Sequence, residues 1–217
     1  MKLLVFFLII ALSSCEIKLK GIDLSDRDKT VYWEKLKNDV KFIILRAGYG
    51  TNTTDSVFEE YYKKCKQYGI PVGAYWHGRP TGIKKAAVEA KAFMERLSGK
   101  KFEYPVFYDI EENSMIAAGM EIAPRILEVF CNTLQQNKYY CGIYAGKNNL
   151  IKYFTKPVLN KYDIWIADYT TTTTFKGHKI WKYTDTGKLS SKPGNCGLSW
   201  SYYNYPPIIK YKHLNGY

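Results

Sequence analysis

Seven short apolar runs recur along this 217-residue chain, and helical patterns separate the first five of them. The runs are KLKGIDLS, KFIILRAGYG, PVGAYWHG, YPVFYDIE, YYCGIYAG, YDIWIADY and HKIWKYTD. Most of their apolar stretches are continuous, as is typical of strands that are buried on both faces. A strand–helix–strand order of this kind predicts parallel strands that are joined by right-handed crossovers.

Helical periodicity is clearest over 55–68, 83–97 and 123–136, and shorter helices are expected over 31–38 and 148–154. The pattern then changes, because only TTTTTFKG separates YDIWIADY from HKIWKYTD. That connection is too short and too β-branched for a crossover helix. We therefore predict an α/β fold, a single modified TIM-like barrel of five βα units followed by about three strands without crossover helices. We expect these last strands to be antiparallel, with a short strand near Leu198–Tyr203.

The first fifteen residues, MKLLVFFLIIALSSC, have the composition of a secretory signal peptide, so residues 16–217 are expected to form the barrel. The segment LSSC also resembles a bacterial lipoprotein cleavage box, which would leave a lipid anchor on Cys15. We therefore expect a secreted protein, or one in the phagosomal or lysosomal lumen if the source is a eukaryote. No later run is long enough for a transmembrane helix.

Four cysteines remain when Cys15 is set aside: Cys65, Cys131, Cys141 and Cys196. Four thiols in an exported chain predict two disulfide bonds, and three pairings are possible. The sequence does not choose among them. No Cys/His cluster has metal-ligand spacing, so we expect no metal and no cofactor.

The formal charge of +12 favours attraction to an anionic partner such as a cell wall. No nucleic-acid-binding motif is present, so we do not expect a nucleic-acid partner. No internal repeat or second domain is evident, and a monomer is expected. The triplet NTT at Asn52 is an N-glycosylation acceptor if the host is a eukaryote.

Acidic residues stand at the carboxyl ends of three predicted strands, where a parallel barrel has its active site. They are Asp23, the pair Asp109 and Glu111, and Asp168. Alternation along a strand places Asp109 and Glu111 on the same face, with their Cβ atoms about 6.5–7 Å apart. Two carboxyls this close titrate at different pH values, and a proton donor beside a carboxylate is the apparatus of glycoside hydrolysis.

Two other interpretations of these acids stay open. One is a solvated strand end in which an acid pairs with Arg46 or Arg79, and the other is a metal site made of carboxylates. Aromatic side chains follow the same strands and suit the apolar faces of sugar rings, although roughly half of them are expected to fill the core. They are Tyr49, Tyr75, Trp76, Trp165, Tyr169, Trp181 and Tyr183.

These segments together resemble the family 25 glycoside hydrolases, the Chalaropsis-type lysozymes, from about Lys20 to Gly187. KGIDLS is similar to the opening strand of that family, YPVFYDIEEN to its D-x-E segment, and IWIADY and IWKYT to its late strands. FIILRAGYGTNTTDSVFEEYYKKCKQYGIPVGAYWHG is similar to its second and third strands with the helix between them.

The resemblance implies a muramidase that cuts the β-1,4 bond between N-acetylmuramic acid and N-acetylglucosamine in bacterial peptidoglycan. It implies that Glu111 is the general acid/base, that Asp109 orients or charges the substrate acetamido group, and that Asp23 is a supporting carboxylate. It further implies that Tyr75 offers a hydroxyl to the substrate. From their places on the strands we expect Asp168 and Trp181 to contact the substrate as well.

The chain departs from the family pattern at two positions. Lys182 stands where the family usually has Gln, and Ser199 stands where it tends to have a last Asp. The tail YYNYPPIIKYKHLNGY has no counterpart in the pattern. Two alternative functions follow: a non-catalytic glycan-binding protein on the same barrel, and a barrel glycosidase that acts on chitin. We expect an enzyme, because Glu111 and Asp109 are both present.

Overall fold

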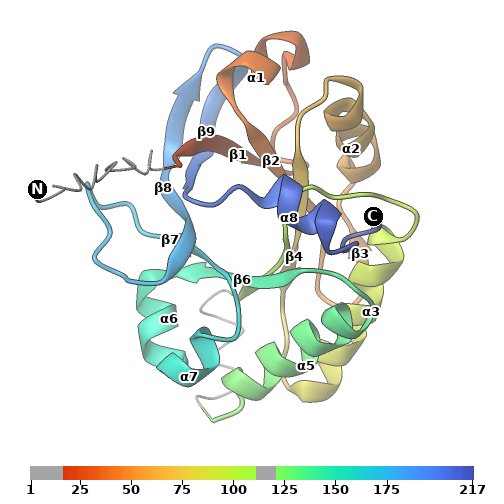
Figure 1. Cartoon of the computed structure of the whole chain (residues 1–217), viewed down its shortest axis with the longest axis vertical. Coiled ribbons are helices and arrows are strands. Elements are labelled where there is room, and N and C mark those ends of the chain that lie inside the picture. The colour runs from red at the N-terminus through yellow and green to blue at the C-terminus, as the bar shows by residue number, and fades with distance from the viewer. Residues whose placement is uncertain (1–16, 111–120) are drawn as a thin grey trace, which may run out of the picture.

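The structure of the protein is a computed structural model that describes residues 17–110 and 121–217. In this part of the chain eight strands close into a barrel, surrounded by helices (Figure 1). The strands are β1 (Leu19–Leu24), β2 (Phe42–Tyr49), β4 (Val72–Gly78), β5 (Val106–Ile110), β6 (Cys141–Gly146), β7 (Ile164–Ala167), β8 (His178–Leu189) and β9 (Lys192–Ser201). A two-residue strand, β3 (Thr53–Thr54), pairs with the end of β2.

Within the barrel, β1, β2, β4, β5, β6, β7 and β8 pair with one another in parallel, and β9 pairs antiparallel with both β8 and β1. The short β3 pairs antiparallel with β2. The predicted barrel is thus confirmed, but the prediction that β7 and β8 are antiparallel is wrong. These two strands are parallel although residues 168–177 contain no helix. Strand β7 has only four residues, about 13 Å at ~3.3 Å per residue. A ten-residue extended loop is long enough to return along it.

The helices are α1 (Trp33–Asp39), α2 (Phe58–Gln67), α3 (Ile83–Leu97), α5 (Ala123–Gln136), α6 (Lys147–Tyr153), α7 (Lys156–Leu159) and α8 (Tyr205–Tyr211). The predicted bounds of α3 and α5 agree at both ends. Helix α3 stops at Ser98, and the next residue, Gly99, has a positive φ of 72° that favours glycine. Helices α7 and α8 were not predicted from the sequence: α7 has only four residues, and α8 lies in the tail, whose Tyr- and Pro-rich sequence shows no clear helical period.

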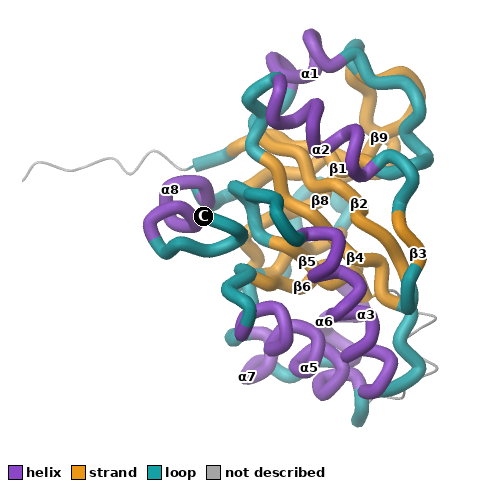
Figure 2. The backbone as a smooth tube through the Cα atoms, turned by 90° about the vertical axis from the view of Figure 1, so that its right-hand side faces the viewer, coloured by secondary structure: helices purple, strands orange, loops and turns teal. Residues whose placement is uncertain are grey.

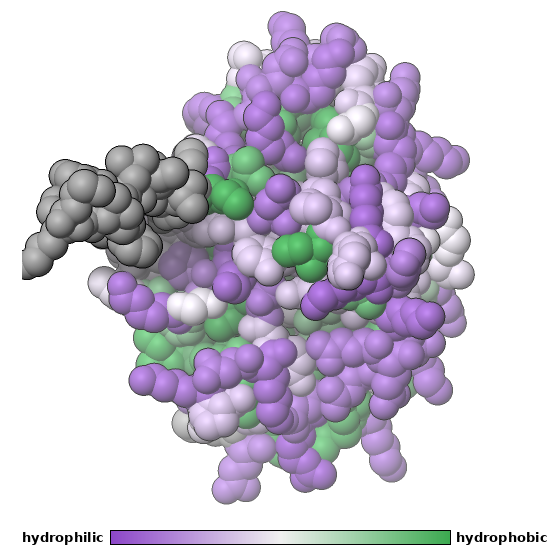
Figure 3. Space-filling model, viewed as in Figure 1, coloured by the Kyte–Doolittle hydropathy of each residue, from purple (hydrophilic) through white to green (hydrophobic). Residues whose placement is uncertain are grey.

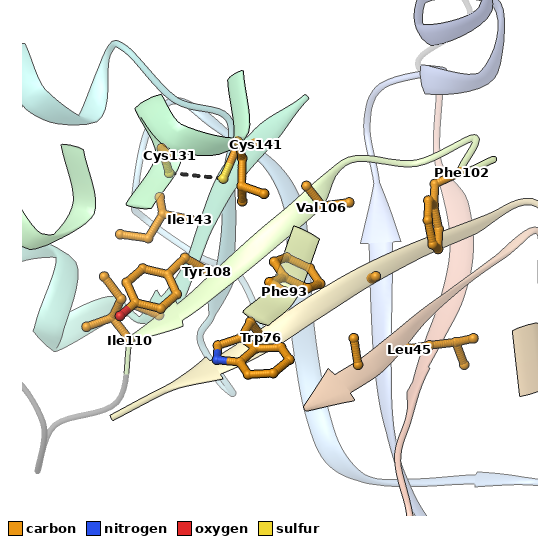
Figure 4. Packing of buried hydrophobic residues seen from close by; sticks show 14 of the residues in the cluster. Leu45, Trp76, Phe93, Phe102, Val106, Tyr108, Ile110, Cys131, Cys141 and Ile143 are labelled. Carbon is orange, nitrogen blue, oxygen red and sulfur yellow. Dashed lines mark hydrogen bonds between the residues drawn. The ribbon is translucent and has the colours of Figure 1, made fainter. Parts of the chain in front are cut away.

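Alternation along the strands separates two cores. On β5, Phe107 belongs to the inner core of the barrel, whereas Tyr108 belongs to the outer core beneath the helices. In the outer core Tyr108 stacks on Phe130 of α5 at 3.6 Å between ring centroids, and Trp76 and Phe93 lie nearby (Figure 4). The inner core is rich in aromatic residues: Phe42, Ile44, Tyr104, Phe107, Tyr144, Trp165, Ile180, Tyr205 and Ile209.

The C-terminal tail closes one end of the barrel. Helix α8 lies across that end in Figure 1, and Figure 2 shows it on the side opposite β3. The fully buried Asn215 fixes the segment: its Nδ2 donates to the Tyr104 carbonyl at 2.9 Å, and its Oδ1 accepts from the Tyr140 amide at 2.7 Å. The backbone of Asn215 also bonds to Phe102 and Lys138. The tail therefore completes the inner core.

The face of the molecule that carries α8 is mostly hydrophilic, with apolar side chains interspersed (Figure 3). Within residues 17–110 and 121–217, no helix combines the length and the apolar character needed to cross a bilayer.

Replacement of Asn215 by Ala should lower the free energy of unfolding by about 2–5 kcal/mol, because two buried backbone groups lose their partners at ~1–3 kcal/mol each. Urea titration followed by circular dichroism measures the change. Lys212→Ala is the matched control, since Lys212 is exposed in the same segment and should alter the midpoint little. An unchanged midpoint for Asn215→Ala would contradict the proposed anchoring of the tail.

Candidate active site

A cleft of about 660 Å³ lies at the carboxyl ends of the parallel strands, the end at which barrel enzymes place their active sites. In Figure 2 this end is marked by β3, opposite the tail. Its lining combines acidic, basic and aromatic side chains, among them Asp23, Asp109, Tyr75, Tyr144, Trp165, Tyr169, His77, Arg27, Arg46, Arg79 and Lys182. A polar cleft with aromatic walls suits a polyhydroxylated ligand that also has apolar faces.

The structure brings together Asp23 at the end of β1, Asp109 at the end of β5 and Tyr75 on β4. Glu111, the predicted proton donor, lies outside the described residues. In both Asp23 and Asp109, Oδ2 has a hydrogen-bond partner, whereas Oδ1 is buried without one among the described residues. Unsatisfied buried acceptors are costly and are concentrated where function requires them.

Asp109 is held by a histidine. His77 Nδ1 lies 2.8 Å from Asp109 Oδ2 and donates its proton to the carboxylate. The contact follows from register, because His77 of β4 pairs directly with Asp109 of β5. Asp109 is buried, and the His77 side chain is 25 % exposed. His77 therefore fixes the orientation of the Asp109 carboxylate at the end of β5.

Asp23 is held by a lysine. Lys182 Nζ on β8 lies 2.9 Å from Asp23 Oδ2, and both side chains line the cleft. Burial alone would lower the pKa of Lys182, but the charge and the hydrogen bond of Asp23 raise it above its ordinary value. Lys182 is therefore a cation at neutral pH.

The charges of both carboxylates act on the Tyr75 phenol. Burial, and then the negative charges of Asp23 and Asp109, raise the pKa of its phenol well above the ordinary value. The hydroxyl is therefore protonated at neutral pH, and it can donate a hydrogen bond to a ligand. The ring packs edge-on against Trp165 at 6.0 Å between centroids.

Arg46 pairs with acids other than Asp109. Its Nε donates to Asp55 Oδ2 at 2.7 Å, and its Nη2 donates to Asp26 Oδ1. Arg79 lies 4.6 Å from the centre of the Tyr49 ring, in cation–π contact. Among the described residues, neither arginine pairs with Asp23 or Asp109; Glu111 lies outside them.

Two predicted substrate contacts lie away from the cleft lining. Asp168 forms an ion pair with Lys147 at 3.1 Å, and its carbonyl accepts from the Trp181 indole at 2.6 Å. Trp181 belongs to the outer core. Ser199, which stands at the position of the family Asp, is buried inside the barrel, where its hydroxyl accepts from the Trp165 indole at 3.1 Å.

Sequence reasoning missed His77 and Lys182 as parts of the site. No motif singles out His77 in the sequence; the signal that finds it is the pairing of its strand with that of Asp109, where the two residues lie opposite each other. Lys182 was noted only as a departure from the family pattern. Within the described ranges, no group of three or more His, Cys, Asp or Glu residues is arranged to hold a metal ion.

A parallel barrel with a pair of carboxylates at the strand ends and an aromatic cleft has the organisation of a glycoside hydrolase. The family model for glycosyl hydrolases family 25 matches residues 22–192, and the chain belongs to that family. This confirms the resemblance seen in the sequence.

Several relatives agree with the assignment. An autolytic lysozyme of Clostridium acetobutylicum is 23% identical over 190 residues, which are 83% of this chain and 55% of the relative. A family 25 glycosyl hydrolase of Bacillus anthracis superposes with a TM-score of 0.77 at 23% identity, covering 90% of this chain and 94% of the other.

The modular autolysin LytC of Streptococcus pneumoniae, solved in complex with a synthetic peptidoglycan ligand, superposes with a TM-score of 0.77 at 24% identity. The match covers 84% of this chain and 46% of that protein. The chain thus spans about half the length of the clostridial lysozyme and of the pneumococcal autolysin.

We predict that His77→Phe lowers kcat/KM for bacterial wall hydrolysis by about tenfold, equivalent to ~1.4 kcal/mol of barrier, because Asp109 loses its donor while ring volume is kept. The control is His178→Phe, at a histidine outside the cleft that should leave kcat/KM near wild type. Equal effects of the two substitutions would show that the His77 contact is not specific to the reaction.

Proposed function

We propose that the protein is a lysozyme that hydrolyses the β-1,4 bond between N-acetylmuramic acid and N-acetylglucosamine in bacterial peptidoglycan. The observation that carries the proposal is the D-x-E segment at the end of β5, whose Asp109 lines the cleft of a family 25 barrel. Glu111 is the general acid/base, with Asp109 assisting and Asp23 shaping the field around them. Clearing of a Gram-positive wall suspension by the purified protein tests it.

Substrate assistance explains how the bond is hydrolysed without an enzyme carboxylate that acts as nucleophile from the other side of the sugar. Because strand alternation in the sequence predicts that Asp109 and Glu111 project from one strand face, we expect neither to face the other side of the sugar as a nucleophile would. The oxygen of the substrate 2-acetamido group attacks the anomeric carbon instead, Asp109 steadies that group, and Glu111 protonates the leaving oxygen. The configuration is then retained without a sugar–enzyme bond, and an inverted product would contradict this mechanism.

The same assay separates the two other functions. A glycan-binding protein would bind walls without releasing reducing sugar, and a chitin-directed enzyme would degrade chitin in preference to peptidoglycan. Ser199 in place of the family Asp is the observation that favours the binding protein. We favour the enzyme, because Ser199 bonds to Trp165 inside the barrel, whereas Asp23 and Asp109 line the cleft.

We propose further that the chain is exported and acts at the bacterial wall as a monomer. The apolar segment at residues 1–15, including Cys15, lies outside the described residues, so the proposal of export is supported by the sequence pattern alone. Glycosylation of Asn52 stays a prediction that depends on the host; the residue is exposed beside β3.

Glu111→Gln should reduce wall hydrolysis by about 10²–10⁴-fold, the usual contribution of a positioned general acid. Folding and glycan binding should be kept, because the two side chains differ little in shape. Glu112→Gln is the matched control, since alternation places Glu112 on the opposite face of the segment. Release of reducing ends from purified peptidoglycan measures both. Near-normal turnover by Glu111→Gln would rule out its role as the acid.

The cysteines are buried free thiols in the structure, so the two predicted disulfide bonds are not formed there. Cys131 and Cys141 are nevertheless adjacent, with their sulfurs 3.1 Å apart (Figure 4). We propose that this pair is the one that oxidises in an exported chain: the two thiols lose two protons and two electrons to the disulfide of a thiol–disulfide oxidoreductase, and an S–S bond forms. Cys65 lies on α2 and Cys196 on β9, and both stay reduced.

Alkylation of the denatured exported protein, followed by mass spectrometry, should therefore label Cys65 and Cys196 and leave Cys131 and Cys141 linked. Cys131→Ala should free Cys141 for labelling, and Cys65→Ala is the control that should leave the linked pair intact. Four labelled thiols in the exported wild type, or a bond that involves Cys65 or Cys196, would contradict the pairing.

A further inference from the structure

The ion pair between Lys182 and Asp23 joins two strands that are not neighbours. Lys182 lies on β8 and Asp23 on β1, and β9 runs between them. Nζ and Oδ2 are 2.9 Å apart, and the two side chains are only 12% and 15% exposed. The lysine side chain therefore crosses β9 on the floor of the cleft.

Gly197 makes this crossing possible. The residue pairs with Asp23 in the β1–β9 ladder and also lines the cleft. A Cβ atom at position 197 would lie 2.3 Å from Asp23 Oδ1 and 2.6 Å from Lys182 Cε, closer than atoms can approach. The strand is thus built with no side chain at the one point where the ion pair passes over it.

Lys182 donates a hydrogen bond to the Asp23 carboxylate. The positive charge nearest by strand order on the other side, Arg46 of β2, is engaged with Asp26 and Asp55. The described lining of the cleft also has the titratable groups Asp26, Asp28, Asp109, Asp185, Tyr49, Tyr75, Tyr144, Tyr169, Cys196 and His77, and the cations Arg27, Arg79 and Lys192. Lys192 is paired with Asp28 at 2.7 Å, and Arg79 lies over the Tyr49 ring, so Lys182 is the cation in direct contact with Asp23.

A buried ion pair is weak evidence for stability, because removing two charges from water costs about as much as their attraction returns. Loss of one partner is different, since the remaining charge is left uncompensated in the interior. The pair is therefore better explained by what it does to Asp23 than by what it adds to the fold.

We propose that Lys182 is a positioning residue for Asp23: it fixes the carboxylate in one orientation on the cleft floor and supplies the positive charge beside it. This inference depends on the proposed hydrolysis, in which Asp23 supports the reacting sugar. It also explains how a cation is accommodated beside the acids of the site. The lysine and the carboxylate act as one unit, and neither substitutes for the other.

The central test is the pH profile of kcat/KM on purified peptidoglycan for Lys182→Met. Without a cation beside it, a buried carboxylate is protonated more readily, so the acidic limb should move upward by about one pH unit. The loss should be about tenfold at pH 5 and smaller near pH 8. Lys182→Arg keeps the charge and should keep the wild-type limb.

Lys66→Met is the matched control, because it also removes a lysine from a partly buried ion pair, with Glu103 near the opposite end. It should leave the profile unchanged. In the background of Asp23→Asn, Lys182→Met should have little further effect, since the carboxylate it serves is gone. A full additional loss in that background, or a wild-type profile for Lys182→Met alone, would overturn the proposal.

Failure of the two proposals can be told apart. If the wild type releases no sugar from any wall, the proposed hydrolysis fails, and the proposal for Lys182 is judged by carboxyl NMR. Aspartate labelled with ¹³C at its carboxyl, with Asp23 assigned from the Asp23→Asn spectrum, should titrate at higher pH in Lys182→Met than in wild type. Identical titrations would overturn it. If Lys182→Met does not fold, Lys182→Gln against Lys182→Arg makes the same comparison of charge.

Discussion

The antiparallel strand β9 is the element on which this barrel depends. Six pairs of parallel strands alone would make an open sheet with β1 and β8 as its edges. Strand β9 pairs with both edges and removes them. It also presents small residues to the interior, and these make room for larger side chains: Gly197 lies beneath Lys182, and Ser199 receives the Trp165 indole. Closure of the sheet and the layout of the cleft floor thus have one cause.

The two ends of the barrel divide stability and function between them. At the tail end, Asn215 satisfies buried backbone groups, and Glu103 accepts from Lys66, Tyr217 and the Val72 amide. At the cleft end, Asp23 and Asp109 each keep a buried oxygen without a partner among the described residues. A buried oxygen without a hydrogen-bond partner lowers the stability of the fold, and it persists only where the surrounding structure compensates for this loss. The tail supplies part of that support and was the segment least interpretable from the sequence.

Periodicity predicted much of the fold and part of the site. Continuous apolar runs located the strands, and the regular spacing of α3 and α5 gave their bounds. Strand alternation also predicts which face a residue occupies, and it would have placed Asp168 and Trp181 away from the barrel interior. Trp165 faces the inner core, so Asp168, three positions later, falls on the opposite side; likewise Ile180 is inner and Trp181 outer. Which cation meets which acid depended on register between strands, and register is not encoded in any one segment.

The charged residues form two groups, the paired charges of the cleft and the excess positive charge outside it. The described lining of the cleft has five acids, Asp23, Asp26, Asp28, Asp109 and Asp185, and five bases, Arg27, Arg46, Arg79, Lys182 and Lys192. These charges cancel, so the excess of +12 over the chain lies outside them. A surface excess of positive charge attracts anionic partners, such as the wall of the proposed function, over about 10 Å at ordinary salt, and the attraction weakens as salt rises. The paired charges in the cleft are partly buried and less screened. Wall association should therefore depend on salt more steeply than the chemical step, because the two are governed by different sets of residues.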